Sequence, residues 1–382
     1  MKKFSVFLAV LLFMGMLPVN ASAATNLQVK AKSALLMDVE TGTVLYEQNA
    51  HEALHPASVT KIMTMLLITE AIDAGRIGWN DMVTASEAAA AKGGSQVYLK
   101  VGEQMSVSDM LKSIAVSSAN DCACAMAEHL YGSESAFVDK MNARAAELGM
   151  KDTHFVNCTG LDDAQEAESH KTSAHDIALM SRELMKNHPD IKKFTTIWMD
   201  TVRNGAFGLS NTNKMVRFYN GCTGLKTGFT AKAGYCLSAT AQRDGMELIA
   251  VVMGAESSQD RFAGCKQLLD YGFSNYALIR PEVPNCVVPV RLGVEKEVRA
   301  IPAQEGALLI DKSQKAMVST QVELLEIVDA PVGKGQKLGT LTLKAGEQVL
   351  SQIPMIAEKG VARLTWGEIF WKILQNVAFK KG

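Results

Sequence analysis

The sequence lacks the features that mark several large classes of protein. Its 39 basic and 40 acidic residues nearly cancel, so the formal net charge is −1 and no basic field attracts nucleic acid. It has no glycine-rich loop of the kind that cradles phosphates, and no His and Cys residues with the spacing of a zinc site. It also has no internal repeat and no low-complexity segment. We therefore expect no nucleic-acid partner, no cofactor and no metal ion.

Cysteines are too few and too irregularly spaced to predict a disulfide framework. Their number is seven, so at least one cysteine of an exported chain stays unpaired. Cys122 and Cys124 point to different sides of a predicted helix and should not pair with each other. We expect most of the seven to be small buried hydrophobes, and a single bridge between Cys222 and Cys236 stays open.

The N-terminal apolar stretch is short for a membrane span. It runs from Phe4 to Leu17, after Lys2 and Lys3, whereas a transmembrane helix needs about 20 apolar residues. Ala21-Ser22-Ala23 follows as a small-residue cleavage site. The pattern predicts a secretory signal peptide over residues 1–23 and a mature protein outside the cytoplasm, with an uncleaved anchor as the alternative.

Three short motifs are present, in a fixed order. They are Ser58-Val59-Thr60-Lys61, Ser118-Ala119-Asn120 and Lys226-Thr227-Gly228. Any one of them occurs by chance in many proteins. The ordered triple is informative because each motif has a suitable structural setting.

The first motif is predicted to begin a buried helix. Pro56 suits a first helical turn, and residues 62–68 are almost all apolar. Ser58 then lies near the helix N-terminus, where free N–H groups stabilise an anion, and Lys61 projects from the same face. Lys61 can deprotonate Ser58 if burial and a neighbouring cation lower its pKa. For an isolated match, the alternative is a helix cap followed by a surface lysine.

The second motif falls at a break between two predicted helices. The first helix begins near Ser106, with Asp109 completing an approximate capping box, and the second covers about residues 121–130. On the turn between them, Ser118 can relay a proton, and Asn120 can bind a substrate amide and the catalytic lysine. Alternatively, both residues only cap the second helix.

The third motif precedes a predicted antiparallel hairpin. Residues 235–254 are rich in β-branched and apolar side chains around an Asp244-Gly245 turn. The motif then lies on an edge strand, where Gly228 lets a ligand approach the backbone. Lys226 supplies a positive charge and Thr227 a hydrogen bond, which together suit a substrate carboxylate. An ordinary surface strand with a solvated lysine is the alternative.

The three motifs resemble those of the low-molecular-weight penicillin-binding proteins, which are D-alanyl-D-alanine carboxypeptidases of the serine peptidase type. An opening strand pair at residues 34–45, Gly160-Leu161-Asp162 and Lys232-Ala233-Gly234-Tyr235 extend the resemblance over nearly the whole chain. It implies an α+β fold of the serine β-lactamase and penicillin-binding-protein type, with an antiparallel sheet flanked by helices and a helical lobe.

The resemblance also implies a covalent mechanism. Ser58 would attack the carbonyl between the two terminal D-alanines of a peptidoglycan stem peptide, with Lys61 as its base. Ser118 and Asn120 would assist proton transfer and positioning. Water would then hydrolyse the acyl-enzyme, and β-lactam antibiotics would acylate the same serine.

The substrate-binding residues are assigned by the same resemblance. Lys226 and Thr227, with Gly228, would hold the terminal carboxylate of the substrate. The backbone N–H groups of Ser58 and Phe229 would form the oxyanion hole.

Two positions depart from the family pattern. Thr212 stands where members often carry an Arg that helps bind the carboxylate, and Arg217 is a possible substitute. Thr159 stands where many relatives have a His. Both changes bear on substrate preference and turnover more than on reaction class.

Polar residues after the Gly-Leu-Asp stretch are interpreted without a catalytic role. Glu166 and Glu168 are expected to be solvated. His170 and Asp176 are treated in the same way, because Ser173 and Asp176 form a capping box for a helix through Leu184. A supporting role for Asp176 behind the site is the alternative.

A domain boundary is predicted near Ile279. Helical patterning up to residues 258–271 and Gly272 gives way to alternating runs, which predict a small all-β domain over residues 280–360 after a peptidase domain over residues 24–279. The expected strands cover residues 286–290, 322–328, 337–343 and 348–353. We expect spacing or partner binding from this domain, or a purely structural role.

An amphipathic helix is predicted over residues 361–382. Apolar residues recur there at helical spacing, at Trp366, Ile369, Phe370, Ile373, Leu374 and Val377. Such a helix is too short and polar to span a bilayer, but it can lie on the outer face of the cytoplasmic membrane. Alternatively, it packs onto the β domain.

Two other functions compete with the carboxypeptidase. A β-lactamase shares the acylation machinery but is disfavoured by the extra β domain and by the absence of a Glu-x-x-Leu-Asn deacylation motif. A weakly catalytic penicillin-binding scaffold is disfavoured because all three motifs are intact.

Overall fold

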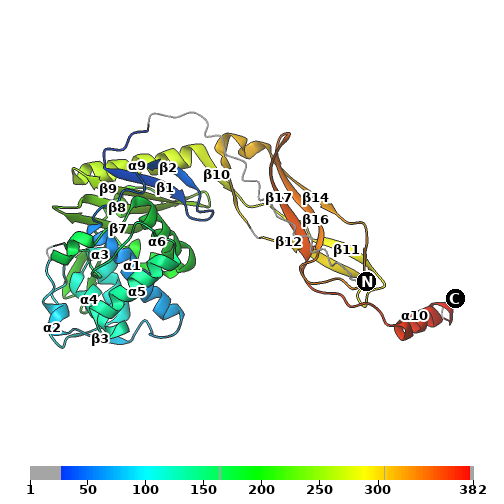
Figure 1. The fold of residues 1–382 in the computed structure, drawn as a ribbon, viewed down its shortest axis with the longest axis horizontal. Coiled ribbons are helices and arrows are strands. Elements are labelled where there is room, and N and C mark those ends of the chain that lie inside the picture. The colour runs from blue at the N-terminus through cyan, green and yellow to red at the C-terminus, as the bar shows by residue number, and fades with distance from the viewer. Residues whose placement is uncertain (1–26, 163–164, 305, 379–382) are drawn as a thin grey trace, which may run out of the picture.

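The computed structural model describes residues 27–162, 165–304 and 306–378, so the predicted signal peptide lies outside the described residues. Figure 1 shows a large domain of helices and sheet at one end and a narrow β domain at the other. Helix α10 (Trp366–Ala378) extends from the far end of the β domain. Among the described residues, no helix has the length and apolar character needed to cross a membrane.

A five-stranded antiparallel sheet forms the centre of the large domain, in the order β2-β1-β9-β8-β7. Asp244 and Gly245 both have positive φ, of 50° and 78°, as the predicted two-residue hairpin requires. β7 lies at the edge, where the third motif was predicted. The strands are β1 (Ser33–Asp38), β2 (Val44–Gln48), β7 (Cys222–Thr230), β8 (Gly234–Arg243) and β9 (Met246–Ala255).

Helix α9 (Ser258–Asn275) covers one face of this sheet, packing on β8 and β9. It continues past Gly272, where the sequence predicted its end. A Cβ on Gly272 would lie 2.4 Å from Leu248 Cδ1, so the glycine brings the helix close to the sheet. Its helix-breaking tendency is overridden by this packing.

A helical lobe covers the other face, around the buried helix α1 (Lys61–Asp73). The predicted caps are confirmed: Ser106 Oγ accepts a hydrogen bond from Asp109 N, and Ser173 Oγ accepts one from Asp176 N. The other helices of the large domain are η1 (Ala57–Thr60), α2 (Glu87–Ala90), α3 (Val107–Ser117), α4 (Asn120–Tyr131), α5 (Glu134–Glu147), η2 (Gln165–Ser169), α6 (Ala174–Asn187), η3 (Pro189–Ile191), α7 (Lys192–Thr195) and α8 (Met215–Phe218). Two short antiparallel pairs complete it, β3 (Met82–Thr84) with β4 (Gln104–Ser106) and β5 (Met199–Val202) with β6 (Phe207–Ser210).

All seven cysteines are free, and six of them are buried. In the β7–β8 ladder, Cys222 is opposite Ala241 and Cys236 is opposite Gly228. The two thiols therefore lie far apart along the ladder, and the bridge that the sequence left open does not form.

The β domain contains a six-stranded sheet in the order β14-β16-β17-β12-β11-β15. The expected strand over residues 322–328 is divided, because β14 ends at Leu324 and β15 pairs with β11 at the opposite edge. The strands are β11 (Cys286–Arg291), β12 (Glu297–Pro302), β14 (Val318–Leu324), β15 (Val328–Asp329), β16 (Lys337–Ala345) and β17 (Gln348–Ala357).

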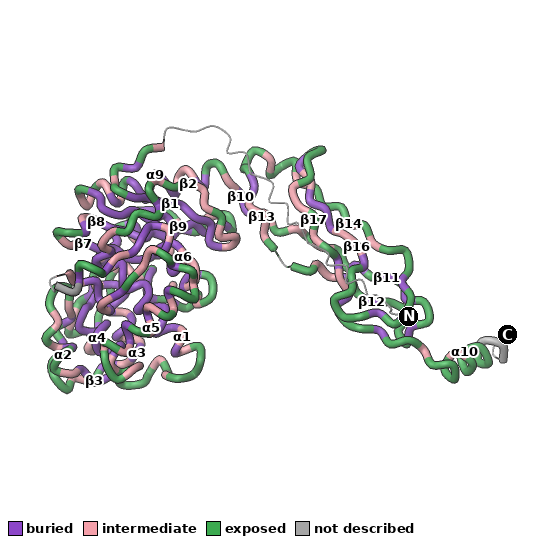
Figure 2. The backbone as a smooth tube through the Cα atoms, in the orientation of Figure 1, coloured by how far each residue is buried: buried purple, intermediate pink, exposed green. Residues whose placement is uncertain are grey.

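A two-stranded sheet lies at the junction of the domains, formed by β10 (Tyr276–Ile279) and β13 (Leu308–Asp311). Lys312, in the short helix η4 (Lys312–Met317), donates from Nζ to the Phe273 carbonyl at 2.7 Å. After β12 of the β domain, the chain therefore comes back through β13, and η4 contacts the end of α9. Figure 2 shows that the buried backbone is concentrated in the large domain.

Candidate active site

The first motif lies where η1 leads into α1, close to the edge strand β7. Ala57, which precedes Ser58, has a φ of 48°, a strained conformation for a residue with a side chain. A Cβ on Gly228 would lie 2.8 Å from Pro56 O and 3.1 Å from Ser58 N. Glycine is therefore required at this position of β7 for the strand to reach the first motif.

Ser58 and Lys61 form the hydrogen bond that the motif predicts. Lys61 Nζ lies 2.9 Å from Ser58 Oγ and 2.7 Å from Thr159 O. The lysine is fully buried, and burial lowers its pKa to about 7, while nearby Cys158 and Asp121 act in the opposite direction. The sequence analysis also expected a neighbouring cation to lower this pKa, but burial is the main cause. Neutral Lys61 is therefore abundant at neutral pH and can accept the Ser58 proton.

The second motif places two unsatisfied polar groups in the interior. Ser118 is the residue after α3, with φ 62°, and Asn120 is the first residue of α4. The N-cap of α4 is Ala119, so the alternative that both side chains cap this helix is wrong. Asn120 Nδ2 donates to Gly93 O at 2.7 Å, whereas Asn120 Oδ1 and Ser118 Oγ are buried without a partner. Such groups are rare in folded proteins and are available to a ligand.

The third motif is buried rather than solvated. Lys226 is 1% exposed, and its Nζ donates to Thr227 O at 3.0 Å. Burial, followed by the charges of Lys61 and Arg261, lowers the Lys226 pKa well below its usual range. Thr227 Oγ1 donates to Thr212 Oγ1 at 2.6 Å. The edge strand thus carries a buried amine and a hydroxyl group, and a neighbouring anion would favour the charged form of this amine.

Arg261 of α9 is a part of this region that the sequence analysis missed. Its Nη1 donates to Gly228 O at 2.9 Å, and its Nε is buried without a partner. Arg217, the possible substitute for the missing family arginine, is instead exposed on α8. The sequence does contain a signal for this residue. Arg261 is the single arginine of α9, and it lies on the same helix face as the apolar residues Cys265 and Leu268.

The remaining polar residues divide into exposed and buried groups. Glu168 is exposed and paired with Lys232, as expected for a solvated residue, and the Glu166 side chain lies outside the described residues. Asp176 accepts hydrogen bonds from Asp152 N and Thr153 Oγ1, which gives it a structural function. His170 is only 2% exposed and contacts the first motif, which its polar sequence context did not indicate.

One group among the described residues has ligand atoms close enough to hold a metal: Glu70, Glu183 and His188. Arg144 donates to Glu70 at 2.7 Å and to Glu183 at 2.6 Å. The guanidinium therefore already supplies the positive charge there, and the group lies apart from the three motifs.

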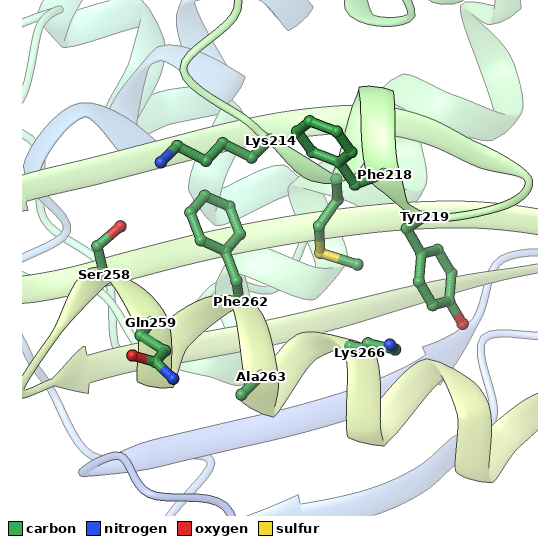
Figure 3. A pocket seen from close by; sticks show the side chains of 9 residues that line it. Lys214, Phe218, Tyr219, Ser258, Gln259, Phe262, Ala263 and Lys266 are labelled. Carbon is green, nitrogen blue, oxygen red and sulfur yellow. The ribbon is translucent and has the colours of Figure 1, made fainter.

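An apolar cavity of about 560 Å³ lies between α8 and α9. Figure 3 shows Phe218 and Phe262 on its opposite walls, with Lys214 and Lys266 at its margins. No residue of the three motifs lines it. It is therefore separate from the residues of the three motifs.

The chain matches the family model described as D-alanyl-D-alanine carboxypeptidase over residues 20–257, and the penicillin-binding protein 5 C-terminal domain over residues 285–363. It is 43% identical to the D-alanyl-D-alanine carboxypeptidase DacF of Bacillus subtilis, over 90% of this chain and 89% of that one. Penicillin-binding protein 5 of Haemophilus influenzae has a similar structure, with a TM-score of 0.75, 29% identity and coverage of 89% and 100% of the two chains. The ampicillin-bound penicillin-binding protein D2 of Listeria monocytogenes gives a TM-score of 0.57, 34% identity and coverage of 65% and 99%.

Proposed function

Since the chain belongs to the D-alanyl-D-alanine carboxypeptidases and is a serine-type hydrolase of that family, we propose that Ser58 is its nucleophile and Lys61 its general base. The substrate is a peptidoglycan stem peptide that ends in D-Ala-D-Ala. The observation that carries this assignment is the 2.9 Å contact between Ser58 Oγ and a fully buried Lys61 Nζ.

Acylation begins when Lys61 takes the proton of Ser58 and Ser58 Oγ attacks the carbonyl carbon between the two D-alanines. The N–H groups of Ser58 and Phe229 hold the oxyanion of the tetrahedral intermediate. The C–N bond then breaks, and the proton passes from Lys61 through Ser118 to the departing amine. A water molecule hydrolyses the resulting ester and restores the hydroxyl of Ser58.

The terminal carboxylate is bound by Lys226 and Thr227, with Gly228 leaving room for the substrate backbone along β7. A carboxylate here favours the charged form of Lys226, which burial and the charges of Lys61 and Arg261 otherwise disfavour. Asn120 positions the substrate amide through its unpaired Oδ1. β-Lactam antibiotics acylate the same serine, which agrees with the ampicillin-bound relative.

Two incubations test this function against its alternatives. The protein is mixed with a D-Ala-D-Ala peptide and, separately, with penicillin, and the products are followed by mass spectrometry. A carboxypeptidase releases D-alanine and keeps a long-lived penicilloyl adduct on Ser58. Rapid penicillin hydrolysis would identify a β-lactamase, and no turnover of either compound would identify a scaffold.

The protein acts in the cell-wall space outside the cytoplasm, where the substrate of its family is found. We propose export through cleavage after the predicted signal peptide at residues 1–23. The proposed units are then a peptidase domain at residues 24–279, a β domain at 280–360 and a terminal helix at 361–382.

Helix α10 is the proposed membrane contact. Trp366 is 87% exposed, and Phe370 and Trp371 are each 63% exposed, so these rings are not packed onto the β domain. Thr365 and Glu368 form a capping box that stabilises the helix start. An exposed aromatic face at the far end of the molecule suits the interface of an anionic bilayer (Figure 1).

A further inference from the structure

His170 is a buried neutral histidine that contacts the first motif. Val156 N–H donates to its Nδ1 at 3.2 Å, so this nitrogen is an acceptor and the ring proton lies on Nε2. Nε2 lies 2.8 Å from Thr60 Oγ1. Burial lowers the His170 pKa to about 3, so the ring stays neutral across the working pH range and donates one fixed hydrogen bond.

The hydrogen bond continues from Thr60 to the backbone before the nucleophile. Because Thr60 Oγ1 accepts from His170, its own hydroxyl proton is free, and it donates to Ala57 O at 2.8 Å. The result is one directed chain from His170 through Thr60 to the Ala57 carbonyl. Hydrogen bonds in such a chain polarise and strengthen each other.

The Ala57 carbonyl is held from a second side by Gly160. A Cβ on Gly160 would lie 1.8 Å from Ala57 O and 2.8 Å from Thr60 Oγ1. Only glycine leaves room for this carbonyl. The strained φ of 48° at Ala57 is thus maintained by contacts from two distant segments.

The Ala57 carbonyl and the Ser58 N–H belong to one planar peptide, in which they point in opposite directions. Fixing the carbonyl therefore fixes the direction of the Ser58 N–H, which is one donor of the proposed oxyanion hole. Polarising the carbonyl also makes this N–H a stronger donor.

We propose that His170 and Thr60 are positioning residues of the oxyanion hole, which orient and polarise the Ala57–Ser58 peptide. This inference rests on the proposed function, because the hole matters only if Ser58 is acylated. It assigns His170 a function in catalysis without any contact with the substrate.

The test replaces the relay hydroxyl and measures acylation. Thr60→Val removes the hydroxyl and keeps a branched side chain. We expect the second-order rate of penicillin acylation to fall by about 10- to 100-fold, somewhat less than the 10²–10³ measured for loss of a whole oxyanion donor. The KM for a peptide substrate should change little, because the lost interaction acts in the transition state.

Infrared spectroscopy of the penicilloyl-enzyme gives a readout that a merely structural function would not move. The ester carbonyl stretch should shift to higher frequency in Thr60→Val, since weaker hydrogen bonds polarise this carbonyl less. His170→Leu should show the same shift, and His170→Gln, whose amide retains an N–H donor, should show a smaller one. If Thr60→Val does not fold, the difference in carbonyl frequency between the two His170 variants tests the inference instead.

Thr69→Val is the matched control. Thr69 is buried on α1, the helix that follows Thr60, and its hydroxyl donates to the carbonyls of Met65 and Leu66. Equal acylation rates and carbonyl frequencies in the Thr60 and Thr69 variants, or in the two His170 variants, would overturn the inference. Failure of the proposed function is distinguishable, because penicillin would then label Ser58→Ala as well.

Discussion

The large domain and the β domain differ in the groups that they bury. The large domain encloses Lys61, Lys226, Ser118 and Asn120, and two of these side chains have an unpaired polar atom. Among the described residues of the β domain, Thr342 is the buried polar residue. The β domain has an ordinary apolar core, whereas the three motifs of the large domain bury polar groups, which lowers the stability of the folded state.

The charges of the β domain are instead paired at its surface. Arg291 and Asp329 form a bidentate pair, with side chains 61% and 60% exposed. Solvent-exposed ion pairs contribute at most about 1 kcal/mol to stability. The comparison indicates that the large domain buries polar groups at a cost in stability, whereas the described part of the β domain buries one polar residue, Thr342. Variants of the buried polar groups should therefore change activity and stability in opposite directions.

Replacement of the nucleophile should have the largest effect. Ser58→Ala is expected to abolish covalent labelling by penicillin and to leave the melting temperature nearly unchanged, because Ser58 is only half-buried. Intact-protein mass spectrometry measures the label. Ser113→Ala is the control, since its buried hydroxyl donates to Asp109 O of its own helix. A labelled Ser58→Ala protein would show that another residue is acylated.

Replacement of the proposed base, Lys61, should lower activity and raise stability. Lys61→Met is expected to lower kcat/KM by at least about 10³-fold, since nucleophile activation is lost. It should also raise the free energy of unfolding at pH 7 by about 1–3 kcal/mol. The lowered pKa of Lys61 corresponds to a few kcal/mol, at about 1.4 kcal/mol per pH unit, and lost hydrogen bonds offset part of it. An inactive variant that is also less stable would contradict the conclusion that burying Lys61 lowers the stability of the large domain.

The pH dependence of activity and of stability should both reflect the titration of Lys61. The neutral form of Lys61 is active, so kcat/KM should rise with pH along a limb with an apparent pKa near 7 and fall about tenfold per pH unit below it. The unfolded chain binds more protons than the folded one between about pH 7 and the ordinary lysine pKa, so stability should also rise with pH there. His55→Gln is the control, since His55 is a partly buried histidine whose Nδ1 lies 3.1 Å from His170 O, and this variant should retain the limb. A flat profile for the unaltered enzyme would exclude Lys61 as the titrating base.

Replacement of Lys226, the proposed ligand of the substrate carboxylate, should lower activity mainly for substrates that carry this carboxylate. Lys226→Ala is expected to lower kcat/KM about 10- to 100-fold for a peptide with a free terminal carboxylate, and much less for its amide, because a charge-assisted contact disappears. Lys232→Ala is the control, since Lys232 is partly exposed and paired with Glu168. Equal losses for acid and amide would remove the assigned function of Lys226.

Changes beyond the β domain should have the smallest effect on chemistry. Deletion of residues 366–382 keeps the backbone hydrogen bonds that Ala362 and Leu364 make with the β domain. Binding to anionic vesicles should then disappear, while turnover of a soluble peptide persists. A full-length variant with Trp366→Ser and Phe370→Ser should also bind vesicles weakly. Retained vesicle binding would reject the membrane contact.

Local signals in the sequence determined several elements of the fold. The Ser106 cap, the Asp244-Gly245 hairpin and the apolar run after Lys61 were all predicted where the structure has them, because each depends on neighbours within a few residues. The three motifs were also recognisable, since their spacing within each element is fixed by local geometry.

Tertiary structure alone decided how these elements meet and what surrounds them. Gly272 sits inside α9 because of Leu248 on β9. Lys226 loses its solvation because η1 and neighbouring helices pack against β7. His170 and Thr60 are 110 residues apart, and no periodicity in either segment links them. Burial and hydrogen-bond partners depend on packing between distant segments, whereas local propensities depend only on neighbouring residues. For this reason the sequence could propose the reacting groups, and only the folded chain showed the burial and the hydrogen bonds that adjust their pKa values and orientation.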